Sequence, residues 1–173
     1  KKNLPYFLVF GVLALLSWMV WRQRGGGTLK VSETAFGIED TASIVRIFLA
    51  DRQGKQLTLE RSLGAAWTLN QTKVPRPDAV KTVLETLHRW EVKTPVPRPA
   101  VQTVFRNLAT LGVKVEVYLA NKDKKVYYIG AGTPDMRGTY AMLEGSELPY
   151  VLHLPGWEGY LSTRFFTDEE EMR

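Results

Sequence analysis

The sequence predicts an α+β protein in which one N-terminal transmembrane helix precedes an antiparallel sheet packed against two helices. Three observations lead to this prediction. An uncharged apolar stretch of 18 residues lies near the start, strand-like alternation recurs in two later groups, and two amphipathic stretches separate those groups. Because successive strands are joined by short turns, we expect hairpins, with both helices on one face of the sheet.

The apolar stretch is Leu4–Trp21, LPYFLVFGVLALLSWMVW. As a helix it would be about 27 Å long, close to the ~30 Å hydrocarbon thickness of a bilayer. Aromatic rings at its ends suit the membrane interfaces, and it lacks the small-residue cleavage site of a signal peptide. We therefore expect an uncleaved membrane anchor. Its residues include Leu4, Pro5, Tyr6, Phe7, Leu8, Phe10, Leu13, Leu16, Trp18 and Trp21.

The chain divides into four segments on this interpretation. Residues 1–24 are the anchor, and residues 25–42 are a glycine-rich hinge and an irregular lead-in. Residues 43–167 form the α+β domain. Residues 168–173 are an acidic tail that we expect to be solvated.

Strands are expected where β-branched and apolar residues alternate with polar ones. These segments are 43–50, 55–61, 66–70, 113–120, 125–130, 138–144 and 149–154. Apolar side chains at three- and four-residue spacing predict helices over 77–90 and 99–111. Between them, the prolines of Val92–Pro99 predict an extended segment and exclude a central strand.

Composition limits the classes of function. The chain has a net charge of +5, but its first 24 residues hold four basic side chains and no acidic one. The rest has 19 basic and 18 acidic residues, so it lacks the positive charge expected of a nucleic-acid-binding domain. The sequence has no cysteine, which excludes disulfides, iron–sulfur clusters and thiolate zinc sites.

The sequence offers no catalytic motif. Its two histidines, His88 and His153, are too few for a His-based zinc site, and no H-E-x-x-H, G-x-S-x-G or Walker motif occurs. Gly130-Ala131-Gly132 follows a strand but precedes another strand, so we interpret it as a hairpin loop and not a phosphate loop. We therefore expect no enzymatic activity, no cofactor and no metal site.

Two stretches could contact a partner. The aromatic residues Trp157, Tyr160, Phe165 and Phe166 either close the core or form a docking patch, because such rings are enriched at interface centres. The proline-rich segment Thr94–Pro99 is either a rigid connector or a polyproline segment for an aromatic groove.

Three stretches together resemble an uncharacterised bacterial family of membrane-anchored proteins that carry a conserved domain of unknown function. They are FGIEDTASIVRIFLADRQGKQLTLER, DAVKTVLETLHRWEVKTPVP and GTYAMLEGSELPYVLHLPGWEGYLSTRFF. The resemblance covers about residues 33–168. Some members are encoded beside ABC transporters of the gliding-motility auxiliary kind. The resemblance implies one N-terminal helix, an exported domain and an accessory role, and it carries over no site residues.

We therefore expect a non-enzymatic, single-pass accessory or scaffold subunit of a larger protein complex in the bacterial inner membrane. Its partners would be the lipid bilayer and other integral membrane subunits, and not nucleic acid. The resemblance favours a periplasmic domain, whereas the basic residues beside the anchor slightly favour a cytoplasmic one.

Two alternatives stay open. A membrane-tethered binding module for a lipid, glycan or peptide would require a concave apolar pocket with a few polar groups. An enzyme would require His88, His153 and a carboxylate to converge in one cleft.

Overall fold

The computed structural model describes residues 35–62 and 66–173, which belong to one compact unit, Ala35–Arg173. The predicted anchor Leu4–Trp21 and the glycine hinge lie outside the described residues. Within those residues, no helix has the length and apolar character needed to cross a bilayer.

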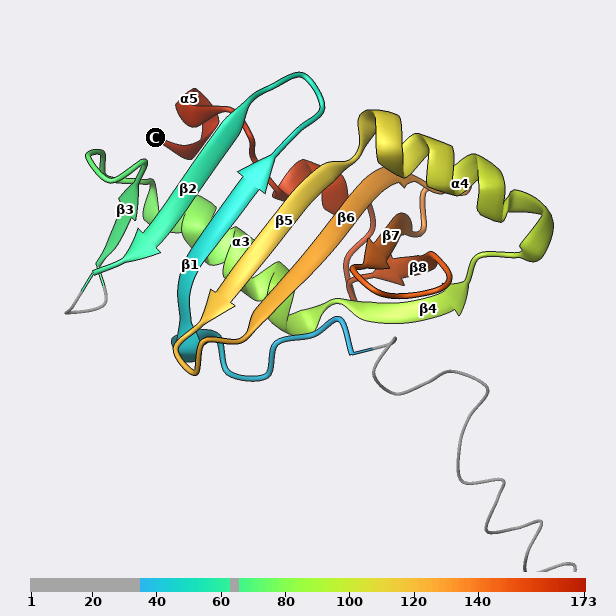
Figure 1. Cartoon of the computed structure of the whole chain (residues 1–173), viewed down its shortest axis with the longest axis horizontal. Coiled ribbons are helices and arrows are strands. Elements are labelled where there is room, and N and C mark those ends of the chain that lie inside the picture. The colour runs from blue at the N-terminus through green and yellow to red at the C-terminus, as the bar shows by residue number, and fades with distance from the viewer. Residues whose placement is uncertain (1–34, 63–65) are drawn as a thin grey trace, which may run out of the picture. The chain divides into compact units, whose positions relative to one another are not determined.

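One antiparallel sheet of eight strands forms the body of the described domain, in the order β3-β2-β1-β5-β6-β7-β8-β4 (Figure 1). The sequence prediction of an antiparallel sheet with helices is confirmed. The strands are β1 (Ile44–Ala50), β2 (Gln56–Arg61), β3 (Trp67–Leu69), β4 (Glu91–Pro95), β5 (Val113–Leu119), β6 (Lys124–Gly132), β7 (Thr139–Leu143) and β8 (Tyr150–His153).

Turn chemistry sets the β1–β2 hairpin. The carboxylate of Asp51 accepts hydrogen bonds from the backbone N–H groups of Gln53 and Lys55, each at 2.9 Å. Gly54 adopts a φ of +91°, which a residue without a side chain reaches at no steric cost. The hairpin then pairs Leu49 with Leu57 across the two strands.

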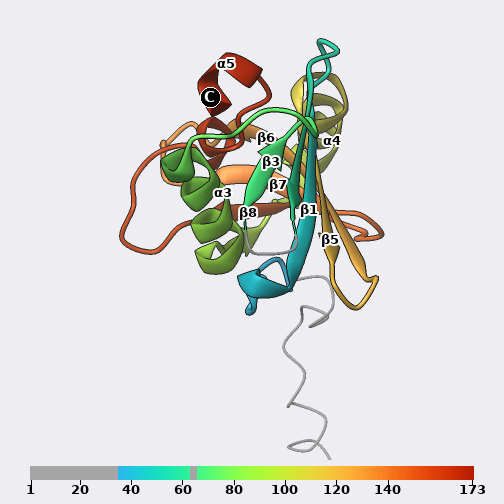
Figure 2. The ribbon, with the colours of Figure 1, turned by 90° about the vertical axis from the view of Figure 1, so that its left-hand side faces the viewer.

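The helices α3 (Pro77–Arg89) and α4 (Arg98–Leu111) lie on opposite faces of the sheet; Figure 2 shows α3 to one side of the strands. Neighbouring strand residues point to opposite faces. Tyr127 packs against Trp90 at the end of α3, whereas Tyr128 packs in the apolar cluster with Val104 and Leu108 of α4. The expectation that both helices cover one face is therefore wrong, because the second face carries its own apolar patch.

The main core lies between α3 and the sheet. Val83 and Leu87 of α3 are fully buried, as are inward residues of the central strands such as Leu49, Leu59 and Val115. Five aromatic rings continue this core, with neighbouring ring centroids 4.9 to 6.1 Å apart. They belong to Phe36, Trp90, Tyr127, Tyr150 and Phe165. Rings of this kind bury roughly 150–250 Å² each, so they account for much of the core's apolar area.

Both ends of the described chain are built into this core. Residues 35–40 have no regular structure, as the lead-in prediction expected, yet Phe36 and Ile38 are buried before the 3-10 helix η1 (Thr41–Ser43). At the other end follow the 3-10 helix η2 (Leu161–Arg164) and the short helix α5 (Glu169–Met172).

The expectation of a solvated acidic tail holds for Glu170 and Glu171, which are exposed, but not for the rest of the segment. Met172 is completely buried, Asp168 pairs with Lys55 at 2.6 Å, and Glu169 pairs with Lys73. The segment docks because Met172 is apolar and because Lys55 of the β1–β2 turn and Lys73 after β3 pair with its first two carboxylates.

Both edges of the sheet are poor templates for another strand. β4 is an edge strand, which agrees with the exclusion of a central strand by the prolines of Val92–Pro99, and Pro95 has no N–H to donate. At the other edge β3 has only three residues, and Leu69 is already bridged to Lys73 on its outer side. Short, proline-bearing or covered edges oppose strand addition.

Candidate functional site

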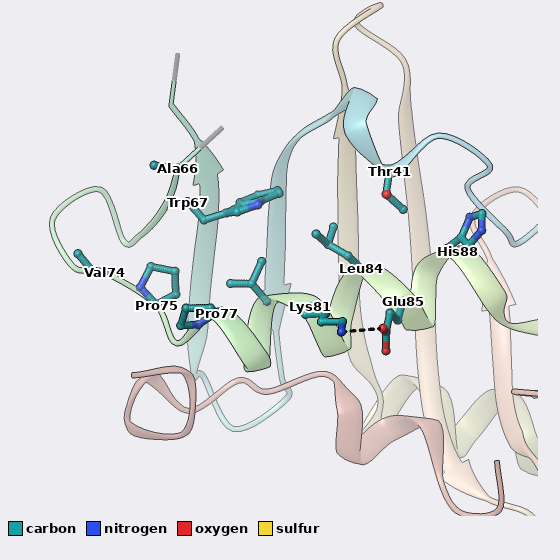
Figure 3. Close-up of a pocket in the computed structure, with 11 residues that line it drawn as sticks. Thr41, Ala66, Trp67, Val74, Pro75, Pro77, Lys81, Leu84, Glu85 and His88 are labelled. Carbon is teal, nitrogen blue, oxygen red and sulfur yellow. Dashed lines mark ion pairs between the residues drawn. The ribbon is translucent and has the colours of Figure 1, made fainter. Parts of the chain in front are cut away.

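An open apolar groove of about 530 Å³ lies between α3 and β3 (Figure 3). Its apolar lining comes from the start of β3, from the loop that follows this strand and from one side of α3. These residues are Ala66, Trp67, Val74, Pro75, Pro77, Val80 and Leu84. Polar side chains stand at the rim, contributed by Thr41, Lys81, Glu85 and His88.

Trp67 provides the largest ring in the groove. It lies opposite Arg61 in the β2–β3 pairing and on the same face as Leu69, whose side chain is buried in the core. The guanidinium of Arg61 lies 4.8 Å from the centre of the Trp67 ring, and its Nη1 donates to the carbonyl of Ala42 at 2.6 Å. Arg61 therefore holds the Trp67 ring by a cation–π contact, and the guanidinium is itself fixed by its hydrogen bond to the backbone.

The outer wall of the groove is the segment Lys73–Pro77. It is joined to β3 by two backbone hydrogen bonds between Leu69 and Lys73, of 2.7 and 2.9 Å. Pro75 and Pro77 restrict its backbone, since each ring fixes φ. Val74 is 82% exposed, which is unusual for a branched apolar side chain beside other apolar surface.

The inner wall is one side of α3. Pro77, Val80 and Leu84 follow one another at three- and four-residue spacing and so share this side. Lys81 and Glu85 form an ion pair of 3.7 Å one turn apart. The ring of His88 lies 3.0 Å from the carbonyl of Ile38 through its Nδ1. Within the described lining, the two opposite charges therefore offset each other and the groove is electrically neutral.

A comparison of the chain with protein-family models, curated proteins and solved structures finds no match. The groove is accordingly interpreted from its own geometry.

A second cavity, of about 650 Å³, lies beside β4 and β8 and has a mixed polar lining. Lys93, Arg137, His153, Trp157 and Glu158 all contribute to it, and the Lys93 ammonium donates to the carbonyl of Arg137 at 3.3 Å. Its described lining holds two cationic side chains, Lys93 and Arg137, and one anionic one, Glu158.

The structure does not bring the two histidines together, because His88 lines the groove and His153 lines the second cavity. Among residues 35–62 and 66–173, no three His, Asp or Glu side chains are grouped so as to hold a metal ion. Gly130 to Gly132 continue β6, with the turn falling later, so the predicted hairpin loop begins beyond them.

The C-terminal aromatic residues divide between the core and its margin. Phe165 is buried, with its ring centroid 5.5 Å from that of Trp90. Trp157, Tyr160 and Phe166 are half-buried. Core closure, one of the two interpretations from sequence, is confirmed for Phe165, and a partner contact by the other three stays a prediction.

The proline-rich segment Thr94–Pro99 begins at the sheet edge and ends in the first turn of α4, which starts at Arg98. Its first residues belong to β4, and the backbone N–H of Val96 donates to the carbonyl of Pro149 at 3.0 Å. It therefore connects α3 to α4 while paired with the sheet.

The groove itself was missed from sequence, although its signals were present. Val80, Val83, Leu84 and Leu87 make a stripe on α3 wider than one line of contacts. In addition, Val74 stands between polar residues and prolines, outside any strand or helix pattern.

Proposed function

We propose that this domain is a non-enzymatic docking module that holds an apolar helix of a partner membrane protein in the groove along α3. The observation behind the proposal is the groove itself, which is open, apolar and free of net charge in its lining. Contiguous exposed apolar surface of this kind marks interaction sites, and a tryptophan within it is a typical energetic centre.

The geometry favours a helix over an extended peptide. A peptide strand would need a free sheet edge, but β3 is already bridged to Lys73 on its outer side. A helix instead needs only a neighbouring helix and an apolar stripe, and two helices pack with axes about 8–10 Å apart. The stretch of α3 from Pro77 to Leu84 rises about 10 Å, which matches partner side chains at positions i, i+3 or i+4, and i+7.

The lining also favours a protein side-chain stripe over a lipid headgroup or a glycan. A phosphate headgroup is bound by an excess of positive charge, whereas in the described lining the ammonium of Lys81 is matched by the carboxylate of Glu85, 3.7 Å away. A sugar needs several convergent hydrogen-bonding groups. The described lining is apolar in its interior, and its polar side chains stand only at the rim.

An accessory role in a bacterial inner-membrane complex fits this site. The apolar stretch Leu4–Trp21 would hold the domain close to helices of other integral membrane subunits. The sequence resemblance supports an exported domain and a supporting rather than catalytic task. On this proposal the domain is periplasmic and acts by contact.

Site-specific photo-crosslinking in native membranes tests the proposal. A photoreactive amino acid replaces Val74 in the groove wall of the full chain, and a matched one replaces Leu111 on α4, which is 72% exposed. We expect Val74 to crosslink to an apolar helix of another membrane protein, at sites three or four residues apart. Leu84→Asp should remove this product, while Leu111 should not yield it.

Three results would overturn the proposal: adducts from Val74 with lipid or a second copy of this chain, adducts with an extended segment, or equal yields from Val74 and Leu111. Circular dichroism of Leu84→Asp shows whether the loss reflects docking or unfolding.

A further inference from the structure

The segment Thr167–Met172 contacts the outer wall of the groove at both ends. One carboxylate oxygen of Glu169 pairs with the ammonium of Lys73, and the other accepts from the side-chain amide of Asn70 at 2.8 Å. Three residues later, the carbonyl of Met172 accepts from the backbone N–H of Arg76 at 2.8 Å. The stretch between Asn70 and Arg76, which contains Val74, is thereby held from the C-terminus.

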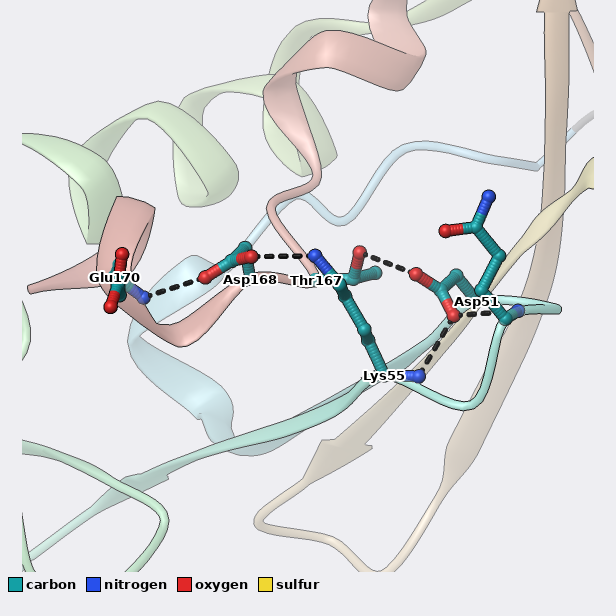
Figure 4. A network of polar contacts seen from close by, with 6 residues as sticks. Asp51, Lys55, Thr167, Asp168 and Glu170 are labelled. Atoms are coloured by element: carbon teal, nitrogen blue, oxygen red, sulfur yellow. Dashed lines mark hydrogen bonds and ion pairs between the residues drawn. The ribbon is translucent and has the colours of Figure 1, made fainter.

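The same segment is fixed independently to the sheet. Asp168 pairs with Lys55 at 2.6 Å, and the hydroxyl of Thr167 donates to Asp51 at 3.0 Å (Figure 4). The side chain of Met172 is completely buried. Attachment to the β1–β2 turn and to the core gives the segment a rigid base from which to hold the wall.

The turn that leads from β3 into the wall has features that require such support. Asn70 and Gln71 have φ angles of +48° and +66°, a region that non-glycine residues occupy at a cost. Asn70 stays there because its side-chain oxygen accepts from the backbone of Thr58 at 2.9 Å while its amide donates to Glu169. Pro75 is buried, but residues 71, 72 and 74 before it are exposed, so the stretch between Asn70 and Pro75 gains little from burial.

We infer that Thr167–Met172 is a clasp that positions the groove wall and thereby controls docking in the groove, with Glu169 as its positioning residue. The inference rests on the proposed function, since the clasp matters to a partner only if the groove binds one. A ligand or neighbouring subunit that displaced this segment would release the wall and weaken binding. The binding site and the end of the described chain are thus coupled without any large rearrangement of the sheet.

The test combines hydrogen exchange with the Val74 crosslink in the full chain. Glu169→Ala breaks the clasp, and Glu171→Ala removes the same charge from the same short helix as a matched control. We expect amides of residues 70–76 to exchange about tenfold faster in Glu169→Ala than in the control, which corresponds to local opening. The crosslink from Val74 should fall severalfold in the same variant. If Glu169→Ala folds poorly, Lys73→Gln removes the other member of the Glu169–Lys73 ion pair, and the same exchange and crosslink are measured in that variant.

The outcomes separate the two proposals. Unchanged exchange in residues 70–76 overturns the clasp, whatever the crosslink shows. Faster exchange with an undiminished crosslink shows that the wall moves but does not control docking, which overturns the inference and leaves the proposed function standing. A chain with no helix crosslink from Val74 in any variant overturns the proposed function, and control of docking falls with it.

Discussion

Two positions in this domain accept only glycine, because a Cβ atom there would overlap a neighbouring side chain. Gly132 lies at the end of β6, directly beneath the ring of Tyr160, and a Cβ placed there would lie 1.7 Å from the Cδ1 atom of that ring. Gly138 is similar, since its Cβ would lie 2.4 Å from a methyl group of Val151. These glycines are required for close approach rather than for a turn.

Gly132→Ala should lower the free energy of unfolding by about 1–3 kcal/mol, because the Tyr160 ring must leave its site to make room. Urea denaturation measures the loss. In a Tyr160→Ala background the same glycine substitution should cost much less, because the obstructing ring is gone. Equal costs in both backgrounds would show that the glycine serves another purpose.

Strands and helices could be predicted from sequence because their signals are local. The alternation of Val113, Val115 and Val117 and the turn at Asp51–Gly54 specify hairpins without reference to the rest of the chain. The face that a helix covers is a long-range property. The stripe of Val101, Val104 and Leu108 on α4 requires an apolar surface but does not identify which side of the sheet supplies it.

The candidate site escaped prediction for the same reason. Val80 and Leu84 have the spacing of any buried helix face, and only the distance between α3 and β3 leaves them facing a groove. The clasp was hidden because Asp168–Glu171 is a run of charges with one methionine after it, which has no periodicity to indicate docking. Its contacts depend on lysines about a hundred residues away in sequence.

The carboxylates of Asp168 and Glu169, at the start of α5, should make stability depend on pH. The hydrogen-bonded Lys73 ammonium and the Asn70 amide lower the pKa of Glu169, and Lys55 together with the N–H of Glu170 lowers the pKa of Asp168. A carboxylate whose pKa is lowered by folding contributes stability above its unfolded value, about 4, and loses it as pH falls through the folded value.

Glu169→Gln should therefore be less stable than the wild type at pH 7, and the gap should close as the pH falls below about 4. Urea unfolding between pH 7 and pH 3 gives the free energies. Glu171→Gln changes the charge of the same helix by the same amount and serves as the control. A gap that stayed constant across this range would show that the Glu169 carboxylate contributes nothing through its charge.

At the scale of the whole domain, segments distant in sequence share one core. The ring of Phe36, from the lead-in, lies 5.9 to 6.1 Å from those of Trp90, Tyr127 and Tyr150. The hydroxyl of Tyr127 donates to the Phe36 carbonyl at 2.8 Å, and burial raises the pKa of that hydroxyl. The lead-in, assigned from sequence to a hinge region, is thus part of the folded unit from Phe36 onward.

A chain beginning at Ala35 should therefore fold alone with one cooperative transition, whereas a chain beginning at Glu39 should not reach comparable stability. The shorter chain loses the buried side chains of Phe36 and Ile38. It also loses the hydrogen bond from the Ile38 N–H to the carbonyl of Leu87, of 2.9 Å. Removal of a buried phenylalanine alone costs about 3–5 kcal/mol.

Thermal and urea unfolding of the two chains measure this difference, and Phe36→Ala in the longer chain gives a value if the shorter one does not fold. The aromatic cluster joins the lead-in, the end of α3 and Phe165, two residues before the clasp. Its loss should therefore also speed hydrogen exchange around Trp90 and Phe165. Equal stability of the two chains would place the boundary of the folded domain after Ile38 and would detach the lead-in from the core.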